Sequence, residues 1–128
     1  MLLLTSFKKT LEERIKDKIF VICIIFAIGY FIFQLTLPEI HNYLSTFYFD
    51  KISHAAFGYV IGSFGYVFSS HYFKKNSMNL LFAIITVGLI GSLKELFDIY
   101  YSHKYFSNSD FAANYIGLLI FYIRKSKK

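Results

Sequence analysis

Four long apolar segments, separated by short polar stretches, dominate the pattern of hydrophobic and polar positions along this chain. They cover residues 19–37, 52–73, 78–100 and 109–123. A helix rises about 1.5 Å per residue, so about 20 apolar residues cross the hydrocarbon core of a bilayer. The pattern therefore predicts an all-α fold, a four-helix transmembrane bundle, with the fourth segment the shortest.

Two further stretches have the periodicity of amphipathic helices. In residues 1–18 an apolar stripe recurs every three or four positions, formed by Leu4, Phe7, Leu11 and Ile15. This stripe predicts a helix on the cytoplasmic membrane face, or a solvated extension of the first span. After Pro38 ends the first span, the same spacing predicts a short interfacial helix, formed by Ile40, Tyr43, Leu44, Phe47 and Tyr48. The chain thus divides into an amphipathic segment, 1–18, and one membrane domain, 19–128.

Small residues and composition agree with this interpretation. Gly58, Gly62 and Gly65 share the second segment, a spacing that lets helices approach closely, and we interpret them as packing positions. The 128 residues are 55% hydrophobic and only 17% charged, whereas soluble domains carry about a quarter charged residues. The single cysteine, Cys23, lies in the first apolar segment and excludes an intramolecular disulfide.

The basic residues predict the orientation. The net charge is +6, but the lysines and arginines flank apolar segments, so we expect membrane lipids rather than nucleic acid as partners. If all four segments span, eleven of the fourteen Lys and Arg share one side, and only Lys51, Lys94 and Lys104 lie on the other. The positive-inside rule then places both termini in the cytoplasm. We expect a multi-pass protein of the bacterial inner membrane.

Three polar signatures lie where apolar segments begin or end. Each holds a pair four residues apart, which on a helix places both members on one face; the pairs are Asp50/His54, Lys94/Asp98 and Asp110/Asn114. In the predicted topology all three lie at the outer membrane surface. Ionisable groups beside membrane segments are costly to desolvate and commonly have a function or a partner. The sequence therefore predicts one shared outward-facing site.

Two chemistries suit this site. In the first, His54, Glu95, Asp98 and Asp110 bind a divalent metal such as Zn²⁺, Mn²⁺ or Mg²⁺, with Asp50 orienting the histidine. Such a metal would activate water against a phosphate or acyl ester.

The second chemistry needs no metal. His54 would act as general base, held by Asp50, while Lys94 and Lys51 bind an anionic group such as phosphate. Asn114 would orient the reacting groups. A third interpretation is structural, with the same residues forming helix caps and an ordinary Lys94–Asp98 ion pair.

The polar signatures also resemble a known family. The motifs D-K-x-x-H, from Asp50 to His54, and D-x-x-x-N-x-x-G, from Asp110 to Gly117, resemble those of VanZ-like membrane proteins and of small YfiM-like envelope proteins. The resemblance covers a little over half of the chain. It implies a multi-pass helical protein of the cell envelope; one VanZ-like protein is linked to resistance to glycopeptide antibiotics such as teicoplanin.

Together these features predict a protein that acts on or binds an envelope lipid or a lipid-linked phosphate. As an enzyme it would be a membrane-embedded hydrolase, metal-dependent or acid–base, whose catalytic residues are His54, Asp50, Glu95, Asp98 and Asp110. The alternative is a non-enzymatic membrane module that binds an antibiotic, a lipid or a partner helix.

Overall fold

The computed structural model describes residues 2–45, 49–102 and 108–127, and every regular element in these ranges is an α-helix. The predicted all-α fold is therefore confirmed. Phe47, Tyr48 and Lys104, which the sequence assigns to the interfacial helix and the outer loop, lie outside the described residues. The helices are α1 (Leu2–Ile15), α2 (Lys18–Thr36), α3 (Pro38–Ser45), α4 (Phe49–Ser70), α5 (Asn76–Ser102) and α6 (Asn108–Ser126).

Local capping sets the limits of the first long helix. The Asp17 carboxylate accepts a hydrogen bond of 3.0 Å from the Ile19 N–H and so caps α2. At the other end the Leu37 N–H donates to the Phe33 carbonyl, and Pro38 begins α3. The last helix is longer than its apolar segment suggests, because α6 has 19 residues, or about 28 Å.

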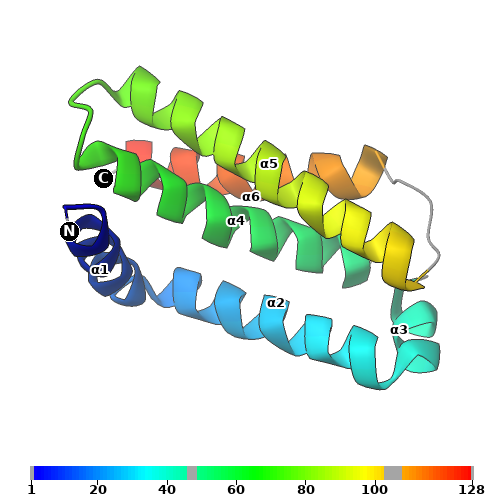
Figure 1. The fold of residues 1–128 in the computed structure, drawn as a ribbon. Coiled ribbons are helices and arrows are strands. Elements are labelled where there is room, and N and C mark those ends of the chain that lie inside the picture. The colour runs from blue at the N-terminus through cyan, green and yellow to red at the C-terminus, as the bar shows by residue number, and fades with distance from the viewer. Residues whose placement is uncertain (1, 46–48, 103–107, 128) are drawn as a thin grey trace.

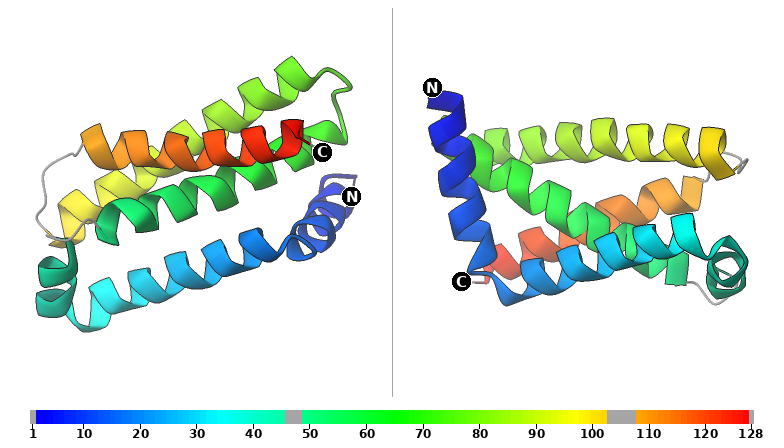
Figure 2. Two further views of the ribbon diagram at one scale, coloured as in Figure 1. Left: turned by 180° about the vertical axis from the view of Figure 1, so that it is seen from behind. Right: turned by 60° about the horizontal axis from the view of Figure 1, so that its bottom comes forward.

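Helix α4 is the centre of the molecule and contacts all five other helices. Helices α4, α5 and α6 pack side by side, α2 lies along the other side of α4, and α1 and α3 cross the two ends (Figures 1 and 2). The N- and C-termini lie at the same end, and α3 lies at the opposite end (Figure 1). The chain order and this arrangement place the beginnings of α4 and α6 beside the end of α5.

Glycines allow α4 and α6 to approach closely. A Cβ atom at Gly58 would lie 1.8 Å from the Asn114 carbonyl oxygen, and one at Gly117 would lie 1.9 Å from the Ala55 carbonyl oxygen. Both neighbours are backbone atoms, which cannot move aside without separating the helices. Gly58 is therefore a packing position, as predicted, and Gly117 is its counterpart on α6. A Cβ atom at Gly62 would lie 2.6 Å from Leu118 Cδ1, so this predicted packing position also faces α6.

Within the described residues, two helices could cross a membrane by length and composition, namely α2 and residues 76–101 of α5. Only 11% of the apolar window of α2 and 22% of that of α5 is buried inside the protein, whereas the core helix of a soluble protein is mostly buried. The four predicted spans are all helical, but α4 and α6 do not meet the same criterion. Their inward-facing polar residues, described next, lower their hydropathy.

Candidate functional site

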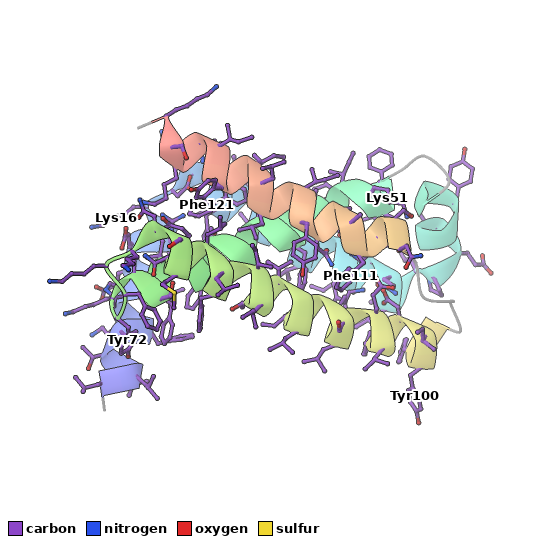
Figure 3. All side chains as sticks on the ribbon, turned by 90° about the horizontal axis from the view of Figure 1, so that it is seen from above. Lys16, Lys51, Tyr72, Tyr100, Phe111 and Phe121 are labelled. Carbon is purple, nitrogen blue, oxygen red and sulfur yellow. The ribbon has the colours of Figure 1, made fainter. Side chains whose placement is uncertain are left out.

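The three polar signatures meet at the end of the bundle where α4 and α6 begin and α5 ends. We call the eight residues gathered there the acidic–histidine cluster: Asp50, Lys51 and His54 of α4, Lys94, Glu95 and Asp98 of α5, and Asp110 and Asn114 of α6. His54, Glu95, Asp98, Asp110 and Asn114 are all at most 8% exposed. Figure 3 shows Lys51 at this end and Lys16 and Tyr72 at the opposite one.

His54 is oriented by Asn114. Its Nδ1 lies 3.2 Å from the Asn114 Oδ1. An amide oxygen can only accept, so this contact is a hydrogen bond when Nδ1 carries the hydrogen. Two glycines make room for this asparagine, since a Cβ at Gly58 would strike its backbone and one at Gly91 would lie 2.8 Å from its Nδ2. The orienting amide predicted from the sequence thus lies in space that these glycines leave open, and among the described residues its buried Nδ2 has no hydrogen-bond partner.

The other imidazole nitrogen faces three carboxylates from three helices. His54 Nε2 lies 3.6 Å from Asp110 Oδ2, 3.8 Å from Asp50 Oδ1 and 3.9 Å from Glu95 Oε1. These separations exceed the 2.7–3.2 Å of a direct N–H···O hydrogen bond. Ligands bound to one ion at about 2.1 Å in a tetrahedron lie about 3.4 Å apart. The spacing therefore suits atoms that share a cation.

The ligand atoms form two overlapping groups around His54. One contains Asp50, His54 and Asp110, the other contains His54, Glu95 and Asp98, and within each group the atoms lie within 4.8 Å of one another. An imidazole nitrogen surrounded by carboxylates is a donor set for Zn²⁺ or Mn²⁺. All four ligands predicted from the sequence belong to these groups. Asp50, predicted to orient His54, faces its Nε2 at 3.8 Å and also belongs to the first of these candidate groups.

The two lysines are directed at carboxylates. Lys94 Nζ donates to both oxygens of Asp98, at 2.7 and 2.8 Å, and Lys51 Nζ donates to Asp110 Oδ1. The sequence predicted that they would bind an anionic group. In the structure the two ammonium groups pair with two of the four acids of the cluster, Asp110 and Asp98.

Gln34 of α2 belongs to the site, although the sequence did not assign it a role there. Its Nε2 donates to Asp98 Oδ1 at 3.0 Å, and the residue is only 6% exposed. Gln34 is one of the few polar residues in the first apolar segment. That isolation was the available signal, because a lone polar side chain in an apolar helix is expected to have a partner.

The formal charge of the acidic–histidine cluster is negative. Its four carboxylates contribute −4 and its two lysines +2, which leaves −2 when His54 is neutral. Concentrated charge away from water is costly unless it is compensated. A divalent cation would neutralise the cluster completely.

A cavity of about 460 Å³ separates α2 from α4 and reaches this cluster. Its polar end is formed by Tyr30, Gln34, Asp50, Ser53, His54 and Lys94. The rest of its wall is apolar. The site is thus accessible from a hydrophobic space between two helices.

A second polar group, which the sequence did not predict, lies where α1 meets α2. The Asp17 carboxylate accepts hydrogen bonds from the Tyr59 hydroxyl at 2.9 Å and from Arg14 and Arg124 at 3.4 and 3.5 Å. Burial opposes ionisation of Asp17, but the Tyr59 and Ile19 hydrogen bonds and the two guanidinium groups outweigh it and lower its pKa below the ordinary 3.8. Arg14 and Asp17 are three residues apart, but Tyr59 and Arg124 come from α4 and α6, and no local spacing connects them to Asp17.

Comparison of the chain with protein-family models, with curated proteins and with solved structures gave no match. The resemblance to VanZ-like and YfiM-like proteins therefore stays a prediction from the motifs.

Proposed function

We propose that this chain is a membrane protein in which α2, α4, α5 and α6 all span, and that its acidic–histidine cluster binds a divalent cation at the outer face. The observation that carries the proposal is the placement of His54 Nε2 within 3.6–3.9 Å of carboxylates from three helices. With the hydrogen on Nδ1, a neutral His54 directs its lone pair at three anions. Either a proton on Nε2, which makes His54 cationic, or a metal ion between these atoms makes this arrangement favourable, and the metal content of the protein distinguishes the two.

The apolar surface supports the membrane part of the proposal. Large hydrophobic side chains are exposed along α2, α5 and α6; among them are Ile22, Ile25, Ile32, Leu81, Leu89, Leu93, Ile116 and Leu119. Monomeric soluble proteins rarely expose contiguous apolar areas of this kind. In a bilayer the same side chains would contact lipid.

The reaction that best suits such a site is hydrolysis of a phosphate or acyl ester of an envelope lipid. A divalent cation polarises the ester oxygen and lowers the pKa of a bound water to about 7, which supplies a nucleophile. Asn114 would hold His54 in the tautomer that binds metal, because it accepts the hydrogen of Nδ1 and leaves Nε2 free for the ion. Asp50 and Glu95 each have an oxygen within 3.9 Å of His54 Nε2, so either carboxylate is close enough to accept a proton from that water.

Metal content tests the proposal. Detergent-purified protein, prepared without chelator and incubated with Mn²⁺ or Zn²⁺, should retain one equivalent of metal after desalting. His54→Ala and Glu95→Gln should lose it with unchanged helicity, whereas Glu39→Gln, which neutralises an exposed acid on α3, should keep it. Release of phosphate from a lipid phosphate, dependent on the same residues, would identify the hydrolase. Absence of bound metal under every condition would refute the cation site.

A structural role is the second candidate, favoured by the hydrogen bonds that join the helices. Lys51–Asp110 links α4 to α6, and Gln34–Asp98 links α2 to α5. If the cluster serves only to connect helices, the His54→Ala protein should unfold more readily in every metal condition. A cation site predicts instead that added metal stabilises the wild type and not His54→Ala.

A further inference from the structure

The cavity between α2 and α4 has one apolar and one polar end. Its apolar wall is formed by Ile24, Ala27, Ile28, Phe31, Phe57, Val60 and Ile61. From Ile24 to Gln34 the wall extends about 15 Å along α2. A volume of about 460 Å³ lies within the range of small-molecule sites. The cavity is therefore long enough for a hydrocarbon chain and not merely for water.

Polar contacts hold α2 at both ends of this space. Gln34 is bonded to Asp98 near one end of α2, and Asp17, the cap at the other end, is bonded to Tyr59 of α4. Between these contacts the cavity is lined by residues of both α2 and α4. Polar contacts therefore lie at both ends of the cavity. The cavity extends from its apolar residues to Asp50, His54 and Lys94.

We infer that this cavity binds the hydrocarbon chain of an amphiphile whose phosphate head lies at the acidic–histidine cluster. The inference rests on the proposed cation site. With a divalent cation bound, the formal cluster charge of −2 becomes zero, and the cation and the Lys94 ammonium, which also lines the cavity, attract an anionic head. A free phosphate ion would leave the apolar wall uncovered.

Photolabelling of the full chain tests the inference. The probe is dodecyl phosphate with a diazirine near the end of its chain, added to metal-loaded protein in detergent. Saturable labelling should fall on the α2 and α4 peptides that contain Ile24, Ile28, Val60 and Ile61. Excess unlabelled dodecyl phosphate should abolish it. Inorganic phosphate and dodecanol should not abolish it, because phosphate lacks the hydrocarbon chain and dodecanol lacks the phosphate head.

Cavity-filling variants supply the matched control. Ala27→Phe on α2, and independently Val60→Phe on α4, should reduce labelling about tenfold. Ile22→Phe makes a similar change on the same helix at a side chain that is 64% exposed and outside the cavity, and should label as the wild type does. Labelling spread over the exposed face of α5, or equal in all variants, would overturn the inference.

Metal content separates this result from the proposed function. Ala27→Phe and Val60→Phe should retain the metal, because neither side chain belongs to the donor set. Full metal content without chain-specific labelling would overturn the lipid cavity and leave the cation site standing. Saturable labelling that dodecanol displaces as well as dodecyl phosphate does would show a site for chains alone and overturn the phosphate head.

Discussion

Among single side chains, Asn114 has the most specific role, because its amide oxygen fixes the tautomer of His54. Asn114→Ala removes this acceptor and should weaken metal binding about 10- to 100-fold, the usual effect of losing such a group. Asn114→Asp retains an acceptor oxygen at the same place and should bind metal at least as well as the wild type. Isothermal titration with Mn²⁺ measures both. Equal loss in the two variants would show that Asn114 acts by packing alone.

Asp17 should make stability depend on pH at the opposite end of the molecule. Its pKa is lower in the folded protein than the ordinary 3.8, so folding favours the ionised form. The stabilisation is complete above that value and disappears as the pH falls through the lower folded pKa. Wild type should be more stable than Asp17→Asn at neutral pH, and the difference should shrink below about pH 4.

Denaturant unfolding in detergent at a series of pH values measures this difference. A wild-type advantage that stays constant down to the lowest pH would contradict the role assigned to the Asp17 carboxylate.

The crossing of α4 and α6 determines the position of the site, because it brings His54 and Asn114 together. Gly117→Ala would place a methyl group 1.9 Å from the Ala55 carbonyl oxygen. The helices must then separate, at a cost of about 1–3 kcal/mol or more. Gly29→Ala is the matched control, since no atom of the described residues lies within 4 Å of its Cβ position, and the better helix former should be neutral or stabilising. Unfolding in mixed micelles compares the two variants.

Helices and the positions of the polar pairs could be predicted from the sequence because both depend on local spacing. Apolar runs give the segments, and pairs four residues apart must share a helix face. The partners across helices could not be predicted in this way. Gln34–Asp98 and Asp17–Tyr59 join residues 64 and 42 positions apart, and only the packing of α2 against the other helices brings them together.

The same limit explains the lysines. The spacing of Lys94 and Asp98 predicted an ion pair as readily as an anion site, and the structure shows the pair. Lys51 has no acid four residues away on its C-terminal side, and its contact with Asp110 of α6 depends on the close approach at Gly58 and Gly117. Local sequence therefore located the site, and the interhelical glycines determined its internal contacts.

For the whole molecule, two topologies are compatible with apolar helices α2 and α5. If all four long helices span, the turn between α4 and α5 lies on the same side as both termini, and the end of α5 lies outside with the cluster. If only α2 and α5 span, the turn between α4 and α5 lies outside, and the end of α5 lies on the same side as both termini. The four-span topology places the carboxylates at a membrane surface. It also agrees with the directions of the helices, because α2 and α5 both run from the end with the termini to the end with α3, so that α4 must cross back between them (Figure 1).

Single cysteines in a Cys23→Ala background distinguish the two topologies. His71→Cys lies in the exposed α4–α5 turn, and Tyr100→Cys replaces a side chain that is 89% exposed near the end of α5. Four spans predict that a membrane-impermeant maleimide labels Tyr100→Cys on intact cells and labels His71→Cys only after lysis. Two spans predict the reverse pattern. Because the proposed lipid must reach the acidic–histidine cluster from the outer leaflet, the reverse pattern would also place the cluster on the wrong side for an envelope substrate.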